Sequence, residues 1–212
     1  SIMVFACDMD GVVTNFPKRF SNLLNTIDSR CPIIQDNNCP SWDWKEWYAP
    51  ELKRIEVAMA IEEAWGIIKN SSGFWNTMEP LFPETMELLA ARAKQQPIIF
   101  ITRRDGYDPW GDTTSWLRAH GIESPLVYVV GSGEEKGDIC KTLGIDIIID
   151  DSPKYADEIL SHGHYLIMPS WKYNEKYRQD NKYNYFRKFH IVNTLEEALL
   201  RAEHISATKR RK

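Results

Sequence analysis

Short apolar runs and amphipathic stretches alternate along most of the chain. The first apolar run, residues 2–7, has no helical spacing and is typical of a buried strand. From Pro83 onward, further apolar runs, each bounded by Gly or Pro, predict strands at 98–101, 126–130, 145–149 and 165–168. Helices are expected between them, and a capping box at residues 194–197 opens a terminal helix. Strands and helices in this order predict an α/β fold with a doubly wound, parallel, Rossmann-like sheet.

The connection between the first two predicted strands is much longer than one crossover helix requires. We therefore assign residues 1–14 and 79–205 to the α/β core and residues 15–78 to a small helical cap inserted after the first strand. Within the cap, apolar spacings of three and four predict a helix over 51–69, and Ser41 is expected to cap a short helix through residue 48.

Two segments near the end of the chain have weaker patterns. The polar, tyrosine-rich stretch 173–189 is interpreted as a long loop that contains at most one short helix. The basic residues 206–212 are expected to form a disordered tail.

Composition narrows the classes of partner and the compartment. A net charge of −4 and a pI near 5.8 give no reason to expect nucleic acid as the main partner. The four cysteines have neither C-x-x-C spacing nor nearby histidines, so structural zinc is not expected, although Cys31 and Cys39 could pair in an oxidising compartment. With no signal-like segment and no apolar run of membrane length, we expect a cytoplasmic protein without membrane contact.

Polar residues of a consistent kind follow the predicted strands. Ligands bind beyond the carboxyl ends of the strands in open α/β sheets, so these residues are expected to share one site. They are Asp8, Asp10, Thr102, Lys136, Asp150 and Asp151. Asp8 and Asp10 are two positions apart and can point to the same side. Each residue alone has a plain structural explanation, such as a turn hydroxyl or a helix cap, but together they predict an active site.

The residue types restrict the chemistry. Converging carboxylates call for a hard cation such as Mg²⁺, while a lysine and a hydroxyl suit phosphate oxygens. The set contains no His or Cys, which excludes a hydrolase triad here. A carboxylate in line with a phosphoryl group can attack it and form an aspartyl-phosphate. Asp8, nearest to the strand, is the candidate nucleophile, and Asp10 is the candidate acid and then base.

These motifs, in this order, resemble those of the haloacid dehalogenase-like (HAD) phosphatase superfamily. The resemblance implies that Asp8 is the nucleophile, that Asp10 is the acid/base and a Mg²⁺ ligand through its carbonyl, and that Asp150 and Asp151 complete the metal site. It also implies that Thr102 and Lys136 bind phosphate, and a helical insertion after the first motif is similar to one type of cap in the superfamily.

Within the superfamily the chain most resembles the 5′(3′)-deoxyribonucleotidases. The likeness rests on DMDGV followed by Phe16, on Gly73-Phe74-Trp75, and on the stretch 79–83 that carries two prolines. It implies that Phe16, Phe74 and Trp75 enclose the base and sugar. An aromatic cap can also be the core of a small helical bundle, and we interpret Trp42, Trp44, Trp47 and Trp65 in that way.

The chain departs from this family after Thr102. Arg103, Arg104 and Asp105 occupy positions where a small residue usually follows Thr102, and this resembles the T-G-R or S-G-R segments of other superfamily phosphatases, including polynucleotide 3′-phosphatases. We therefore expect Arg103 to contact the substrate phosphate.

We hypothesise a Mg²⁺-dependent phosphomonoesterase that acts on a small phosphate substrate, foremost (deoxy)nucleoside monophosphates. One alternative is a phosphatase of nucleic-acid 3′-phosphate ends or of another small phosphate ester, although the acidic composition argues against nucleic acid. Another is a non-catalytic phosphate-binding or receiver-like signalling domain, but a receiver carries its acceptor Asp at the end of the third strand, where this chain has Val130-Gly131-Ser132. The base, the sugar, the phosphate position and a homodimer are left open.

Overall fold

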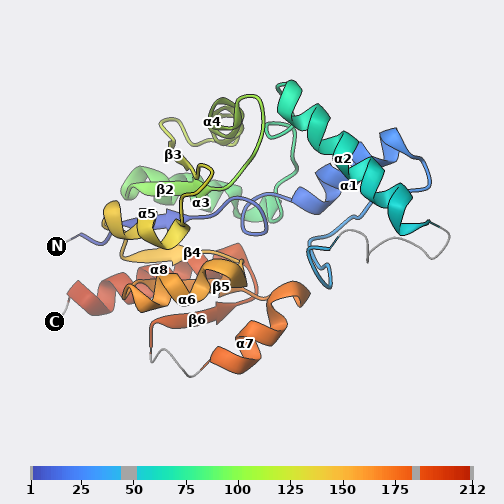
Figure 1. Cartoon of the computed structure of the whole chain (residues 1–212). Coiled ribbons are helices and arrows are strands. Elements are labelled where there is room, and N and C mark those ends of the chain that lie inside the picture. Colours follow the sequence, from blue (N-terminus) through green and yellow to red (C-terminus); the bar gives the residue numbers. More distant parts are fainter. Residues whose placement is uncertain (1, 44–51, 183–186, 211–212) are drawn as a thin grey trace.

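The computed structural model describes residues 2–43, 52–182 and 187–210. Within these ranges, six parallel strands form one sheet in the order β3-β2-β1-β4-β5-β6 (Figure 1). Their bounds are β1 Phe5–Cys7, β2 Ile98–Thr102, β3 Leu126–Val129, β4 Ile147–Ile149, β5 Tyr165–Pro169 and β6 Phe189–Val192. The doubly wound parallel sheet predicted from the sequence is confirmed. Because the strand order reverses next to β1, the site at its carboxyl end lies at a topological switch point.

Helices cover both faces of the sheet, and two hydrophobic clusters fill the space between them. One cluster lies under α3 (Met86–Gln95), α4 (Pro109–Ala119) and α8 (Leu195–Arg210), and the other under α5 (Lys136–Thr142) and α6 (Pro153–Ser161). Successive strand residues alternate between the clusters: Cys7 belongs to the first and Ala6 to the second. This explains the continuous apolar runs, since both faces of each central strand are buried.

The segment between β1 and β2 has a hydrophobic cluster of its own. Helices α1 (Phe16–Ile27) and α2 (Arg54–Asn70) pack against each other, and the residues around Phe74 complete the cluster. The helix expected over 51–69 is present as α2, which begins a few residues later, and the helix expected over 41–48 falls mostly outside the described residues. Both helices lie beyond the carboxyl ends of the strands (Figure 1). We refer to this part as the cap.

The C-terminal part of the core differs from the prediction in two places. The stretch 173–189 contains one α-helix, α7 (Glu175–Asn181), preceded by the short 3-10 turn η3 (Lys172–Asn174), as the prediction of a loop with one short helix allows, but it ends in the edge strand β6, which was not predicted. Strand β6 was missed because its four residues, one of them His190, are too few and too polar to give an apolar run. The disordered tail expected over 206–212 is wrong from 206 to 210, because α8 continues to Arg210 and Ser206 is only 4% exposed.

All four cysteines lie within the described residues and are free, buried thiols, so Cys31 and Cys39 form no disulfide. No helix in the described ranges has both the length and the apolar character needed to cross a membrane.

Candidate active site

Four charged side chains meet where β1 and β4 end. Asp8 directly follows β1, and its amide donates a hydrogen bond of 2.9 Å to the Ile149 carbonyl of β4. Asp150 and Asp151 directly follow β4, and Lys136 is the first residue of α5. All four are at most 7% exposed, so water does not screen their charges.

Lys136 joins two of the three carboxylates. Its Nζ lies 2.7 Å from Oδ2 of Asp150 and 3.3 Å from Oδ1 of Asp8. The other oxygen of Asp150 accepts a hydrogen bond of 2.8 Å from the Ser152 amide. Both oxygens of Asp150 are therefore already engaged, and Asp150 acts as the counter-ion of Lys136.

The donor set fits a divalent cation. Asp8, Asp150 and Asp151 each offer an oxygen within 4.8 Å of the others, and hard cations such as Mg²⁺ prefer oxygen ligands. Burial, opposed by Lys136 and reinforced by Asp150, raises the pKa of Asp8 to about 6, and burial with the charge of Asp8 raises the pKa of Asp151 well above its usual range. Gly11 leaves room beside this cluster, because a Cβ there would collide with the Asp151 carboxylate.

These raised pKa values predict an unusual pH dependence for the metal-free protein. Asp8 has a pKa near 3.8 when unfolded and about 6 when folded. The folded state therefore binds more protons between these values, and the stability that Asp8 contributes is lost as the pH rises through about 6. In chelator, this group should lower the free energy of unfolding by on the order of 3 kcal/mol between about pH 4 and pH 7, and Mg²⁺ should restore it.

Urea denaturation of wild type and Asp8→Asn across this pH range isolates the effect of Asp8. The variant should lose less stability than wild type as the pH rises. Identical pH dependences of the two proteins would show that Asp8 carries no raised pKa.

Asp10 is held by a buried arginine. Arg104 donates to both carboxylate oxygens of Asp10, at 3.1 Å from Nε and 2.8 Å from Nη2, and Thr14 Oγ1 donates to the same carboxylate at 2.9 Å. Arg104 also donates to Thr113 Oγ1 at 2.8 Å and lies 4.7 Å above the Trp75 ring. The guanidinium therefore fixes the orientation of Asp10.

Arg103, the residue singled out from the sequence, is exposed, whereas its neighbour Arg104 is buried. The alternation of side chains along an extended chain accounts for this difference, because Thr102 and Arg104 point to one side and Arg103 to the other. That alternation was the signal in the sequence that could have identified Arg104. A phosphate contact by Arg103 stays a prediction.

Thr102 is the last residue of β2 and is 1% exposed. The register pairs Cys7 with Phe100, so Thr102 comes level with Met9 at the edge that carries Asp8. Within the described part of the chain, its Oγ1 has no hydrogen-bond partner. Buried hydroxyls are rarely left unpaired, so this one is available for a phosphate oxygen.

The three aromatic residues expected to enclose a nucleoside come together in the cap. The Phe16 ring stacks on Trp75 with centroids 5.7 Å apart, and Phe74 meets Trp75 edge-on at 4.7 Å. Trp75 Nε1 donates to the Asp105 carbonyl at 2.8 Å, and Arg104 joins the same ring to Asp10. The cluster is therefore continuous with the carboxylate site.

All three aromatic residues are less than 9% exposed and belong to the cap core. Trp65 packs against this core as expected, while Trp42 is 38% exposed and its ring lies 4.6 Å from that of Tyr173. Trp44 and Trp47 lie outside the described residues.

Sequence reasoning missed three polar residues near Asp151. The Tyr173 hydroxyl donates to Asp151 Oδ2, and Asn37 Nδ2 donates to the Tyr173 oxygen at 3.0 Å. Asn174 Nδ2 donates to the Asp151 carbonyl at 2.9 Å. Burial beside Asp151 raises the pKa of Tyr173 well above its usual range, so the phenol keeps its proton. Tyr173 and Asn174 follow β5, and the rule that sites form at strand carboxyl ends could have identified them.

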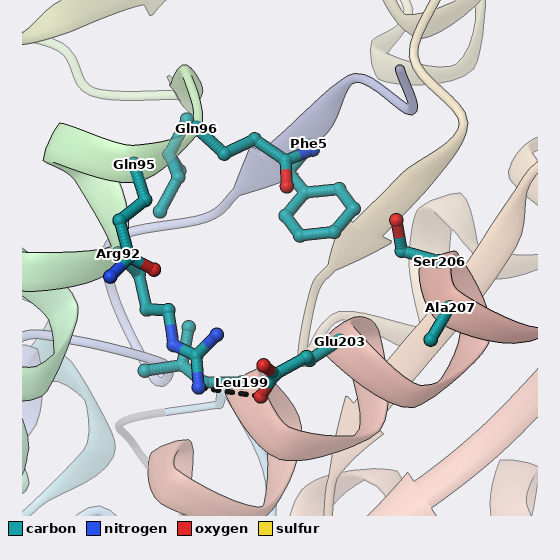
Figure 2. Close-up of a pocket in the computed structure, with 9 residues that line it drawn as sticks. Phe5, Arg92, Gln95, Gln96, Leu199, Glu203, Ser206 and Ala207 are labelled. Atoms are coloured by element: carbon teal, nitrogen blue, oxygen red, sulfur yellow. Dashed lines mark hydrogen bonds and ion pairs between the residues drawn. The ribbon is translucent and has the colours of Figure 1, made fainter. Parts of the chain in front are cut away.

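A separate cavity of about 270 Å³ lies at the other end of the strands, away from the carboxylate site (Figure 2). It is lined by Phe5 and Ile98, the first residues of β1 and β2, and an Arg92–Glu203 ion pair of 2.5 Å joins α3 to α8 across it. Because it lies at the amino ends of these strands, it does not belong to the carboxylate site.

Solved structures with similar folds include haloacid dehalogenase-like hydrolases and phosphatases. The chain matches a haloacid dehalogenase-like hydrolase from Streptococcus pneumoniae with a TM-score of 0.58 and 16% identity, covering 94% of this chain and 97% of that one. It matches a predicted phosphatase from Clostridium acetobutylicum with a TM-score of 0.59 and 14% identity, covering 96% and 100%. At these identities the likeness establishes the fold. The comparison with curated proteins found no match.

A family model gives the more specific result. The model described as "5' nucleotidase, deoxy (Pyrimidine), cytosolic type C protein" matches residues 2–186, a range that includes the whole cap and all six candidate site residues after the strands. This match favours an enzyme over the receiver-like or non-catalytic alternatives. The chain belongs to this nucleotidase family within the HAD superfamily and is a phosphoric monoester hydrolase.

Proposed function

We propose that the chain hydrolyses (deoxy)nucleoside monophosphates to nucleoside and phosphate, with Mg²⁺ and through an aspartyl-phosphate on Asp8. The observation that carries the proposal is the position of Asp8: its carboxylate is buried, lies 3.3 Å from Lys136 Nζ, and shares a metal-sized cluster with Asp151. The family match supports the nucleotide as substrate. The family is described as cytosolic, and the cytoplasm stays the expected location.

In this proposal Asp8, Asp151 and the Asp10 carbonyl would hold Mg²⁺, which would supply positive charge beside the phosphate oxygens. Asp150 completes the carboxylate cluster of the metal site and also orients Lys136, which donates to its Oδ2. Lys136 and Thr102 bind the remaining phosphate oxygens, and the exposed Arg103 contacts the phosphate from the solvent side. These groups lower the barrier by holding the phosphoryl group in line with Asp8.

The reaction has two displacements at phosphorus. An Asp8 carboxylate oxygen attacks phosphorus, the bond from phosphorus to the ester oxygen breaks, and Asp10 gives its proton to the leaving nucleoside oxygen. Asp10 then takes a proton from water as the water oxygen attacks phosphorus. The bond between phosphorus and Asp8 breaks, phosphate leaves, and the Asp8 carboxylate is regenerated.

Phosphate release from a panel of nucleoside monophosphates and sugar phosphates, with Mg²⁺ and with chelator, tests this proposal. We expect turnover of pyrimidine deoxynucleoside monophosphates with Mg²⁺ and none in chelator. Equal or faster turnover of sugar phosphates would reject the nucleotide assignment, and turnover in chelator would reject the metal.

The cap aromatics give a prediction about selectivity. Phe16→Leu keeps an apolar side chain in the cap but removes the ring that stacks on Trp75. If the ring contacts the base, kcat/KM for a nucleoside monophosphate should fall about 10-fold, because base stacking contributes roughly 1–3 kcal/mol. Turnover of glycerol 2-phosphate, which has no aromatic ring, should change much less. Equal losses on the two substrates would mean that Phe16 acts only as part of the cap core.

A further inference from the structure

A chain of two hydrogen bonds joins the cap to the metal-site carboxylate. The Tyr173 hydroxyl donates to Asp151 Oδ2. Asn37 donates to the Tyr173 oxygen at 3.0 Å, and it lies in the cap between α1 and α2. Asn37 and Asp151 therefore meet through one side chain, although they are far apart in sequence. Tyr173 is positioned in turn by Asn174, whose Nδ2 bonds the carbonyls of Asp151 and Pro169 at 2.9 and 2.8 Å.

Other contacts bring the same two segments together. The Lys172 amide donates to Asn38 Oδ1 at 3.2 Å, and the Trp42 ring lies 4.6 Å from the Tyr173 ring. Trp171 Nε1 donates to the Gly11 carbonyl at 2.7 Å, next to the carboxylate cluster. The segment 171–174 is thus held between the cap and the loop that carries Asp8 and Asp10.

Asn37 is an unusual residue for a purely structural contact. Its side chain is fully buried, and within the described ranges its Oδ1 has no hydrogen-bond partner. Burying an unpaired amide oxygen costs free energy, and an apolar residue would avoid that cost. The feature that an apolar residue could not supply is the hydrogen bond to Tyr173.

We propose that Tyr173 is a positioning residue of the Mg²⁺ site: its hydroxyl orients the Asp151 carboxylate. Asn37 makes this orientation depend on the cap, because it holds the Tyr173 hydroxyl. The inference rests on the metal site of the proposed function. Partners that hydrogen-bond metal ligands fix their orientation, and their removal typically weakens metal binding 10- to 100-fold. Without the hydrogen bond from Asn37, Tyr173 keeps only its contact with Asp151, and the Asp151 carboxylate is held less firmly.

Mg²⁺ binding, measured by isothermal titration calorimetry without substrate, tests this link. Tyr173→Phe keeps the ring beside Trp42 and should weaken binding about 10- to 100-fold. Asn37→Ala should weaken it about 2- to 10-fold, as expected for one neutral hydrogen bond. Because Asn37 acts through Tyr173, the double variant should bind no more weakly than Tyr173→Phe.

Matched controls separate the link from general damage. Tyr177→Phe removes a hydroxyl that bonds Asp157 on the same side of the core, and Asn25→Ala removes an amide that bonds cap carbonyls. Both should bind Mg²⁺ as wild type does. Wild-type affinity in Tyr173→Phe, or additive losses in the double variant, would overturn the inference. Absence of binding by wild type would instead reject the metal site of the proposed function.

Discussion

Replacing Asp8 with Asn should abolish phosphate release. The amide keeps the size of the side chain but removes the proposed nucleophile and one proposed metal ligand, and loss of a covalent nucleophile typically lowers kcat by on the order of 10⁴-fold or more. The change also removes one buried negative charge from a cluster of three. The measurement is Mg²⁺-dependent release of phosphate from a deoxynucleoside monophosphate by purified wild type and variant.

The fold provides the control for this prediction. In chelator at pH 7, Asp8→Asn should unfold at the same temperature as wild type or a higher one, because the pKa of the wild-type carboxyl is raised to about 6 and its charged form is unfavourable there. A folded variant with turnover within about 10-fold of wild type would contradict the assignment of Asp8 as nucleophile.

Replacing Lys136 with Met should destabilise the protein strongly. Lys136 is 2% exposed and lies between Asp8 and Asp150, whose charges outweigh the effect of burial and raise its pKa. Its removal leaves these carboxylates buried without their cation, and breaking a buried ion pair in this way costs about 3–5 kcal/mol. Urea denaturation at pH 7 in chelator measures the loss.

Two further variants show whether charge causes this loss. The double variant Lys136→Met, Asp150→Asn removes one of the two buried carboxylates that have lost their cation. It should recover part of the free energy of unfolding that Lys136→Met loses. Lys141→Met changes an exposed lysine on the same helix and should alter stability by less than about 0.5 kcal/mol. If Lys136→Met were as stable as wild type, the buried ion pairs would not contribute as argued.

Much of the fold follows from local pattern. The central strands are buried on both faces, so β1, β2 and β4 appear in the sequence as unbroken apolar runs. Strand β6 lies at the edge, has only four residues, and contains His190, so its formation depends on pairing with β5 and not on its own composition. The last turn of α8 was missed for a similar reason, because residues 206–210 carry no large apolar side chain that would extend the helical pattern.

The site residues also fall into two groups, those that the sequence could predict and those that it could not. Asp8, Thr102 and Asp150 directly follow or end central strands, so the parallel topology alone brings them to one edge. The contact of Arg104 with Asp10 joins two segments of the core that are 94 positions apart, and the contact of Asn37 with Tyr173 joins the cap to the core across 136 positions. No local spacing encodes these partners, and only the three-dimensional packing of the chain reveals them.

Chemical trapping of the aspartyl-phosphate tests the central claim most directly. Asp10→Asn mixed with Mg²⁺ and p-nitrophenyl phosphate, whose leaving group needs no acid, should accumulate the intermediate because the base for the second displacement is missing. After acid quench and borohydride reduction, mass spectrometry of the peptides that carry residues 8–10 and 150–151 should find homoserine in place of Asp8, with residues 10, 150 and 151 unmodified. Homoserine at another aspartate, or p-nitrophenol release with Asp8 unmodified throughout the first turnover, would contradict the account.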